Sequence, residues 1–306
     1  MSQPLVSIVT PSFNSLPYID ETIKSVIDQH YFNIEHIVID GGSTDGTVEI
    51  LKANKHIIWI SEKDNGQSQA INIGFKKANG TIIGWLNADD TYNPGTIETA
   101  VQFFIDNPNI DLLYTDVNII NEKGKVIGIS RGDNFDLQRI LTFNMVKQPS
   151  LFMRRKVVDD LTGLNEELHY VMDQEFWLRA GMNNLKFYYL SNAIFANFRL
   201  IPGTKSFESA TSFCIEWQEV VEKYLNHPVF GFIDSMSKKK ILSHSIARIY
   251  IAKMVSAVVD KNRFLVFSNF YKSVRISPEL LTNMGMWKFL ILGLLGKQND
   301  RLLKFQ

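Results

Sequence analysis

The sequence predicts an α/β fold in which a mostly parallel sheet, flanked by helices, is followed by a helical C-terminal region. Short apolar runs alternate with stretches of helical periodicity over residues 6–106. These runs are apolar throughout, which is typical of strands that a parallel sheet buries on both faces. Beyond residue 207 the alternation stops and glycine is almost absent until Gly285, so this part is expected to be helical.

Four apolar runs predict the central strands. They cover residues 6–10, 36–40, 57–60 and 81–86. A helix is expected over residues 68–78, with Gly80 as its stop. After residue 90 the pattern loosens to a helix over 94–106, a strand over 111–117 and a hairpin turn at 122–125.

The composition is that of an ordinary globular protein of 306 residues, with 45% hydrophobic and 21% charged side chains. The single cysteine, Cys214, excludes an internal disulfide framework and a cysteine-rich zinc site. The change in pattern predicts two parts, an α/β domain over residues 1–206 and a helical region over residues 207–306.

The net charge is zero but unevenly distributed. Residues 236–306 hold 13 Lys and Arg against three acids, which leaves +10 there and predicts an interaction surface. Within them, residues 286–295 are apolar apart from Lys288 but too short to span a bilayer. This segment is either a core helix or an interfacial one that meets an anionic membrane. The interfacial interpretation places these side chains at the bilayer: Trp287, Leu290, Ile291, Leu294 and Leu295.

Polar residues gather where three of the predicted strands end: Asp40, residues 61–66 and residues 87–90. Such residues are common in turns, but the carboxyl ends of parallel strands meet at one edge, where these folds bind ligands. Asn87 and Asp89 are two residues apart and point the same way from an extended backbone. Their hard oxygens suit Mg²⁺ or Mn²⁺ completed by substrate phosphates.

Several motifs, in this order and spacing, resemble family 2 glycosyltransferases of the GT-A fold. They are IVTPSFN (8–14), HIVIDGGSTDGT (36–47), EKDNGQSQAINIGFKKANG (62–80), GWLNADDTYNPG (84–95), KQPSLFMRR (147–155), MDQEFWLR (172–179) and FRLIPGTKS (198–206). They cover the first two thirds of the chain, so the resemblance implies that residues 1–206 are a GT-A nucleotide-sugar transferase domain. The helical region, residues 207–306, would then contact the acceptor or a membrane surface. Each motif alone is loose, but their order and spacing together are specific.

The resemblance implies roles for individual residues. Thr10 and Pro11 would line the nucleotide pocket, and Asp40 would accept the ring N–H of the base. Asp64 and Gly66 would lie near the base and ribose.

The later motifs supply the metal and the chemistry. Asn87-Ala88-Asp89 occupies the place of the family's Asp-x-Asp motif, with Asp89 as the metal-binding acid. Asp173 would be the catalytic base, raised in pKa by burial near Phe176 and Trp177. Arg199 and Lys205 are candidates for the pyrophosphate, although Arg199 could equally be a structural ion-pair partner.

Three positions depart from the family pattern. Asn87 replaces the first aspartate of the metal motif, Gln69 stands where related sequences often have Asp, and Ile201 stands where many have His. The departure at Ile201 leaves a third protein ligand to the metal unidentified.

The resemblance implies an inverting, metal-dependent hexosyltransferase that uses Mn²⁺ or Mg²⁺. It would move a sugar from a nucleotide-diphospho-sugar, with UDP favoured, to a hydroxyl of a glycan or lipid-linked acceptor in polysaccharide or cell-surface glycan biosynthesis. No nucleic acid partner is expected. The alternatives are a non-catalytic sugar- or membrane-binding protein on the same scaffold and a nucleotidyltransferase. Because no signal peptide opens the chain, we expect a cytoplasmic protein, peripheral on the inner face of the cytoplasmic membrane if the interfacial interpretation holds.

Overall fold

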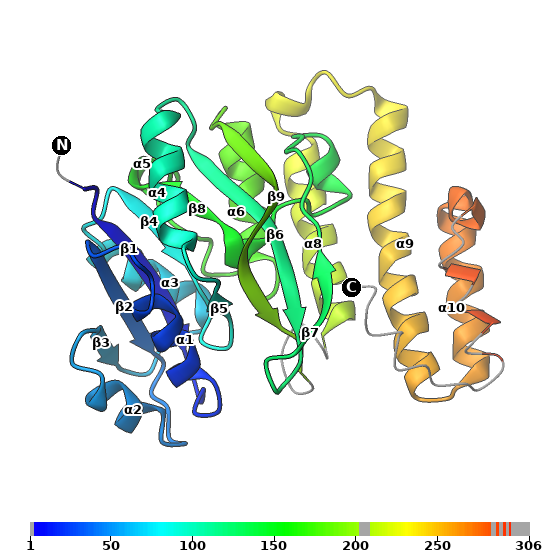
Figure 1. The fold of residues 1–306 in the computed structure, drawn as a ribbon. Helices are drawn as coiled ribbons and strands as arrows, with labels where there is room; N and C mark the ends of the chain where they lie inside the picture. Colours follow the sequence, from blue (N-terminus) through cyan, green and yellow to red (C-terminus); the bar gives the residue numbers. More distant parts are fainter. Residues whose placement is uncertain (1–2, 202–208, 283–285, 288–289, 292–293, 295–306) are drawn as a thin grey trace. The chain divides into compact units, whose positions relative to one another are not determined.

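The fold was analysed in a computed structural model, which describes residues 3–201, 209–282, 286, 287, 290, 291 and 294 (Figure 1). The chain divides into two compact units, residues 1–200 and 201–306. Lys205 and the predicted domain boundary at residues 206 and 207 lie outside the described residues.

A nine-stranded sheet forms the first unit, in the order β3-β2-β1-β4-β8-β6-β9-β5, with β7 paired to β6. The strands are β1 (Val6–Ser12), β2 (Ile34–Asp40), β3 (Ile58–Ser61), β4 (Ile82–Trp85), β5 (Thr91–Tyr92), β6 (Leu112–Ile120), β7 (Val126–Ser130), β8 (Phe152–Arg154) and β9 (Phe187–Arg199). The first four strands in this order are parallel. β8 then runs antiparallel between β4 and β6.

β9 pairs with two strands, β6 and β5. It pairs in parallel with β6, with Arg199 opposite Ile120, and antiparallel with β5, with Asn197 opposite Thr91. Since β5 directly follows residues 87–90, this pairing brings the end of β9 to the predicted metal motif.

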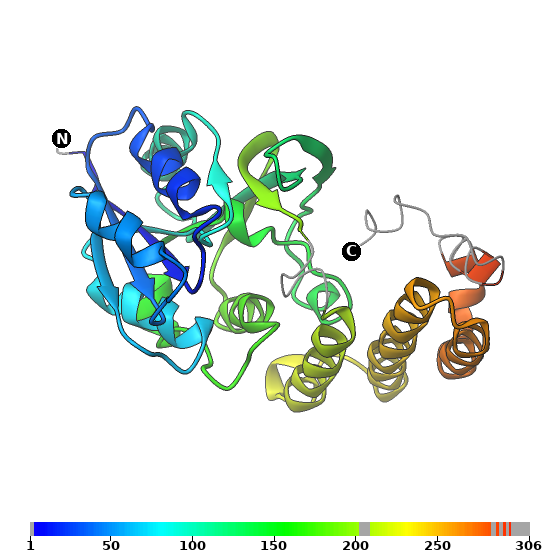
Figure 2. The same cartoon turned by 90° about the horizontal axis from the view of Figure 1, so that it is seen from below.

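Helices cover both faces of the sheet. They are α1 (Ile19–Ile27), α2 (Thr47–Ala53), α3 (Gln67–Lys77), α4 (Thr96–Asp106), α5 (Arg155–Leu161) and α6 (Met172–Met182), with short 3₁₀ turns η1 (Arg139–Leu141) and η2 (Gln148–Ser150). Figure 2 shows α1 and α4 on one face and α3, α5 and α6 on the other. α3 lies so close to β1 that a Cβ on Gly74 would stand 2.3 Å from Val9 Cγ1. Glycine at this position therefore sets the depth of α3 on the sheet.

The second unit is helical throughout its described residues. It contains α8 (Ala210–Leu225), α9 (Ser235–Val259) and α10 (Arg263–Ile276), with 3₁₀ turns η3 (Pro228–Phe230) and η4 (Pro278–Thr282). α9 is long and apolar enough to span a bilayer by length and composition alone. It packs against both α8 and α10 (Figures 1 and 2), although only 39% of its most apolar stretch is buried. Asp234 caps α9 by accepting hydrogen bonds from the backbone N–H groups of Met236 and Ser237.

The predicted fold class is confirmed, as are strands at the four apolar runs, the helices at 68–78 and 94–106 and the turn at 122–125. The run at 57–60, however, forms β3 at the edge of the sheet, where Ile58 is 47% exposed, and not a strand that is buried on both faces. The prediction for the apolar segment was partly wrong. Met286 and Leu290 are buried in the core of the second unit, so Leu290 cannot enter a bilayer. Ile291 and Leu294 are exposed, and Leu295 lies outside the described residues.

Candidate active site

Asp40 closes β2 with its carboxylate fully buried among donors. Its Oδ2 accepts hydrogen bonds from the backbone N–H groups of Gly42 and Ser43 and from Ser61 Oγ, and its Oδ1 accepts one from Ser43 Oγ at 2.5 Å. A carboxylate offers about four acceptor positions, two on each oxygen. Oδ1 therefore keeps one acceptor position for a further donor.

Asp64 lies directly against the end of β2. A Cβ on Gly41 would stand 2.8 Å from Asp64 Oδ2, so only glycine at position 41 lets this carboxylate approach so closely. Asp64 Oδ1 accepts a hydrogen bond from the backbone N–H of Gly66. Gly66, with φ at 119°, begins α3 in a conformation that other residues rarely adopt. Asp40, Asp64 and Gly66 thus form one edge of the candidate site.

Thr10 and Pro11 are buried in β1. Thr10 Oγ1 is hydrogen-bonded to His36 Nε2 at 3.0 Å, inside the sheet. Burial, with a smaller effect of His56, lowers the pKa of His36 to about 3, so this ring is neutral. Thr10 is therefore held within the sheet, and its predicted contact with the nucleotide stays a prediction.

Asn87 is held by hydrogen bonds to other side chains. Its Oδ1 accepts from Gln67 Nε2 at 3.0 Å and from Trp85 Nε1 at 2.9 Å. Its Nδ2 donates to Gln148 Oε1 at 3.1 Å and more weakly to Asp90 Oδ2 at 3.5 Å. Because both groups facing Nδ2 are acceptors, this position needs a donor, and an aspartate would leave them unmatched. The departure from the Asp-x-Asp pattern thus has a local physical cause.

Asp89 and Asp90 are adjacent but differ in their contacts. Asp90 is fully buried, and its Oδ1 accepts a hydrogen bond from the backbone N–H of Arg199. Asp89 is half-buried, and no side-chain partner to its carboxylate is found among the described residues. Burial raises the pKa of both carboxyls, and the charge of Asp89 raises that of Asp90 further. Asp89 is the member of the pair that a ligand can reach.

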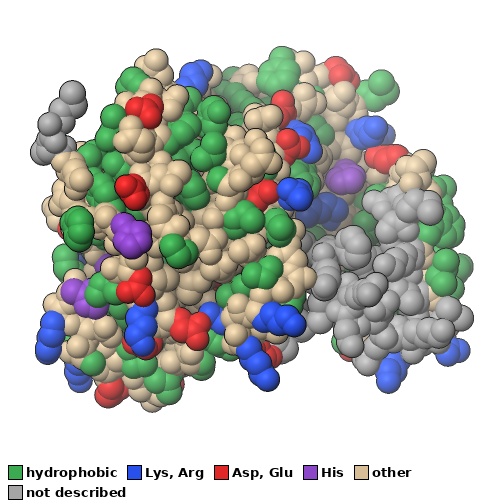
Figure 3. All heavy atoms as spheres, viewed as in Figure 1, with side chains coloured by type: hydrophobic (Ala, Val, Ile, Leu, Met, Phe, Trp, Pro, Cys, Tyr) green, Lys and Arg blue, Asp and Glu red, His purple; other side chains and the backbone are tan. Residues whose placement is uncertain are grey.

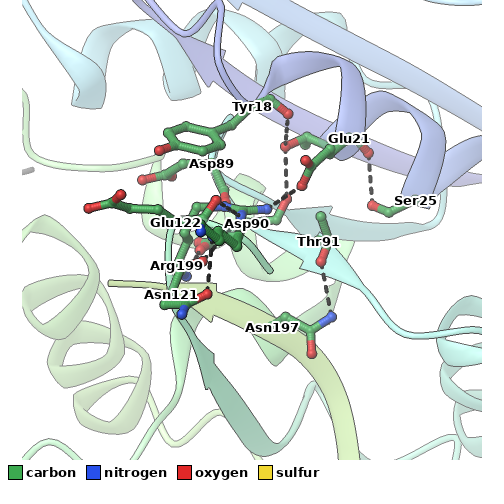
Figure 4. A network of polar contacts seen from close by, with 12 residues as sticks. Tyr18, Glu21, Ser25, Asp89, Asp90, Thr91, Asn121, Glu122, Asn197 and Arg199 are labelled. Carbon is green, nitrogen blue, oxygen red and sulfur yellow. Dashed lines mark hydrogen bonds and ion pairs between the residues drawn. The ribbon is translucent and has the colours of Figure 1, made fainter. Parts of the chain in front are cut away.

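Arg199 fixes the main chain around this pair (Figure 4). Its guanidinium is buried and donates to the carbonyls of Asp89, Asn121 and Glu122. It also forms an ion pair with Glu21 at 2.5 Å. Since four of its five N–H groups are used within the protein, the contacts favour the structural alternative for Arg199 over pyrophosphate binding. Lys205, the other candidate, lies outside the described residues.

The residues around Asp89 fit a hard divalent cation. Figure 4 shows the side chains of Asp89 and Glu122 extending to the same side, past the Tyr18 ring. Among the residues that the structure describes, no group of three or more His, Cys, Asp or Glu side chains could hold a metal. One or two carboxylates are nevertheless what Mg²⁺ takes from a protein when substrate phosphates complete its shell. Ala88, between Asn87 and Asp89, accepts a hydrogen bond from Thr22 Oγ1 through its main-chain carbonyl.

Asp173 stands in the first turn of α6, where the helix dipole favours a negative charge. Burial nevertheless raises the pKa of Asp173 to about 6, opposed by the backbone N–H of Gln174 and by the charge of Lys147. Lys147 interacts electrostatically with both Asp116 and Asp173, and burial lowers its own pKa. The direction predicted for the pKa of Asp173 is therefore found, with burial as its main cause.

Two adjacent residues connect the metal motif with Asp173. Gln148 donates to the carbonyl of Trp85 at 2.7 Å and accepts from Asn87, while the charge of Lys147 lowers the pKa of Asp173. Sequence reasoning did not single out these two side chains, Asp90 or Gln67, although the quoted motifs contain all four. Their polarity beside strand ends was the available signal, but only the fold shows their partners.

The sequence was compared with known proteins. Residues 7–161, just over half of the chain, match the family Glycosyl transferase family 2. The chain belongs to this family. An uncharacterized glycosyltransferase of Haemophilus influenzae is 35% identical over 191 residues, which cover 57% of this chain and 59% of that relative's length.

Two solved structures share the fold. One is Staphylococcus aureus TarS 1-349 in complex with UDP-GlcNAc, with a TM-score of 0.63 and 18% identity over 95% of this chain and 89% of that one. The other is the mannosyltransferase PcManGT of Pyrobaculum calidifontis in complex with GDP-Man and Mn²⁺. It has a TM-score of 0.58 and 15% identity over 96% of this chain and 87% of that one. These likenesses establish a GT-A fold for the family 2 chain.

Proposed function

We propose that this family 2 protein is an inverting glycosyltransferase that moves a sugar from a nucleotide-diphospho-sugar to a hydroxyl of a glycan or lipid-linked acceptor. The observation that carries the proposal is a contrast within the site. Asp89 and Asp173 are part-buried carboxylates for which the described residues supply no side-chain hydrogen bond, whereas the polar residues around Asp89 are paired. Burying carboxylates without such partners is costly, so their retention favours a role in chemistry.

In the proposed reaction Asp173 accepts the proton of the acceptor hydroxyl. The acceptor oxygen forms a bond to the anomeric carbon from the face opposite the leaving group. The bond from that carbon to the diphosphate breaks, and the nucleoside diphosphate departs with the electron pair. A divalent cation, held by Asp89, would supply Lewis-acid stabilisation of the diphosphate.

The raised pKa of Asp173 suits its proposed role. A carboxylate with a pKa of about 6 is mostly deprotonated at neutral pH, yet it is a stronger base than an ordinary aspartate. Lys147 keeps the value from rising further, which preserves the charged form.

The proposed donor edge consists of Asp40, Asp64 and Gly66. Oδ1 of Asp40 has one acceptor position left, which suits the ring N–H of uracil or guanine. UDP-sugars are favoured by the family resemblance, and the two structural neighbours were solved in complex with UDP-GlcNAc and GDP-Man. We propose that the helical region, residues 207–306, contacts the acceptor or the membrane surface that carries it, because its last part carries the excess of basic residues.

A panel of nucleotide sugars with Mn²⁺ in a thermal-shift assay tests the donor, and analysis of the released product tests the reaction. Release of nucleoside diphosphate is expected, and release of pyrophosphate would indicate a nucleotidyltransferase. Absence of both, with donor binding intact, would indicate a non-catalytic binding protein.

Titration calorimetry with UDP, with and without Mn²⁺, tests the metal site. Asp89→Ala should abolish the Mn²⁺-dependent part of UDP binding, whereas Asp160→Ala, at an exposed carboxylate of α5, should leave it unchanged. An unchanged metal requirement in Asp89→Ala would place the ligand elsewhere.

A further inference from the structure

The outer face of α10 is unusual for a solvated helix because it exposes three aromatic rings. Phe264, Phe267 and Tyr271 are 78%, 57% and 57% exposed. Their spacing of i, i+3 and i+7 places them in one stripe along the helix. These three exposed rings therefore form one continuous aromatic surface along the helix.

The opposite face of α10 already provides the packing of this helix. Val266, Asn269, Phe270 and Ser273 are buried, and Phe270 also packs against Trp287 at 5.2 Å between ring centroids. The exposed rings are therefore not needed to hold α10 on the second unit. An exposed apolar stripe with no packing role indicates a surface that another body covers.

The charges on α10 itself are of one sign. Arg263, Lys272 and Arg275 are exposed, and α10 has no acidic residue. The neighbouring acids are the exposed Asp260, which ends α9, and Glu279, which interacts with Lys240 and His244 of α9. Figure 3 shows hydrophobic side chains along the outer edge of the second unit and basic side chains at its lower margin.

We propose that the basic-aromatic face of α10, formed by Arg263, Phe264, Phe267, Tyr271, Lys272 and Arg275, docks on the headgroup region of an anionic lipid bilayer. Aromatic rings favour the interface between headgroups and acyl chains, and basic side chains around them meet anionic lipid phosphates. A second copy of this chain is a poorer occupant, because two such faces would bring like charges together.

This inference deepens the membrane contact proposed for the helical region and relocates it. Met286 and Leu290, from the segment that the sequence pattern favoured, are used in the core of the second unit. The face of α10 offers three exposed rings and three exposed cations, of which Lys272 also lies over the Tyr250 ring of α9, 5.7 Å from its centroid. Membrane binding by this face does not depend on glycosyl transfer, so the two proposals can fail separately.

Flotation of the full chain with vesicles tests the proposal. Phosphatidylglycerol-containing vesicles should carry the protein at low salt, and phosphatidylcholine vesicles should not. The charge variant Arg263→Gln, Lys272→Gln, Arg275→Gln should bind on the order of 100-fold more weakly, at roughly fivefold for each cation removed. The aromatic variant Phe264→Ser, Phe267→Ser, Tyr271→Ser should also lose binding, because it loses the insertion of the rings.

Matched controls lie in the first unit. Lys52→Gln, Lys55→Gln, Lys77→Gln removes three exposed cations, and Phe32→Ser removes a ring that is 93% exposed. Both controls should float like the wild type. Equal flotation of the α10 variants and the wild type, or equal binding to both kinds of vesicle, would overturn the proposal.

Two further measurements separate the remaining outcomes. Sedimentation of the lipid-free chain should show the same association state for the wild type and the aromatic variant. Self-association of the wild type that the aromatic variant removes would instead assign the face to a second copy of the chain. Donor hydrolysis without vesicles should be the same for wild type and α10 variants that keep the wild-type circular dichroism spectrum. If the wild type does not hydrolyse the donor, that result would count against the proposed transferase activity, and the flotation result would still stand.

Discussion

Two sets of buried polar groups in the first unit differ in how many hydrogen-bond partners the protein supplies. Around Arg199, the guanidinium, the Asp90 carboxylate and the Asn87 amide each bind several protein partners. Asp89 and Asp173 carry raised pKa values in part-buried positions without a side-chain hydrogen bond among the described residues. The first set therefore positions the main chain, and the second holds the groups available for ligands and chemistry.

The difference explains why neighbouring residues of one motif have different roles. Asn87 and Asp89 extend to the same side of the chain in a simple strand pattern, yet the fold commits the first to Gln67, Trp85 and Gln148. A polar residue whose hydrogen bonds are complete contributes to stability. A carboxylate that is desolvated without a partner costs stability and is available for binding or proton transfer.

The largest expected effect is at Asp173. Asp173→Asn should reduce the rate of transfer by roughly 10²–10⁴-fold with donor binding nearly unchanged, because an amide cannot accept the proton. The measurement is steady-state transfer alongside calorimetry with the donor. Asp160→Asn, at an exposed carboxylate of α5, is the matched control and should keep full activity. Retained transfer in Asp173→Asn would remove Asp173 from the chemistry.

Arg199 tests the other side of the comparison. Arg199→Lys should lower the free energy of unfolding by about 3 kcal/mol, since lysine cannot reach the three carbonyls and Glu21 together. The exposed carboxylate of Glu21 limits the ion-pair share of that loss. Urea unfolding measures the effect, with Arg139→Lys in a surface pair as the control. Unchanged stability with weakened UDP binding would instead assign Arg199 to the pyrophosphate.

Asn87→Asp restores the family's usual aspartate and should nevertheless destabilise this protein by about 2 kcal/mol. The new carboxylate would face Gln148 Oε1 and Asp90 with no proton to donate. Adding Gln148→Lys, which supplies a donor, should recover part of the loss in a double-mutant cycle. A stable Asn87→Asp protein with stronger Mn²⁺ binding would mean that this side chain turns toward the metal.

The smallest expected effect concerns stability and pH. The pKa of Asp173 is raised on folding, so its protonated form stabilises the fold at low pH, and that stability is lost as the pH rises through about 6. At pH 8 the free energy of unfolding of Asp173→Asn should therefore exceed that of the wild type by ~1–2 kcal/mol, and the variant should unfold at a higher temperature. Near pH 4 the two proteins should unfold at the same temperature. Equal unfolding temperatures at pH 8 would mean that the carboxylate is not desolvated. Transfer by the wild type should rise with pH through the same range, because the base must be charged.

Much of the fold could be predicted because local pattern and packing agree in the first half of the chain. The runs at 6–10, 36–40 and 81–86 are apolar on both faces and become central strands. β9 escaped prediction because most of its residues are half-buried or exposed, and its partners lie far away in sequence. The segment at 286–295 was misjudged in part, because an apolar run looks the same whether a core or a bilayer covers it.

By itself, the sequence determined the α/β class, the position of Asp40 at the end of one strand and of Asp89 after another, and the family to which the motifs belong. These follow from periodicity and from residue types at set spacings, which are properties of the chain alone. Only the tertiary structure decided which of those residues are committed and which are available. Hydrogen-bond partners such as Gln148 for Asn87, or Glu21 for Arg199, lie 61 and 178 residues away along the chain. Desolvation, which raises the pKa of Asp173, likewise arises from the packing of the folded chain, and no local pattern specifies it.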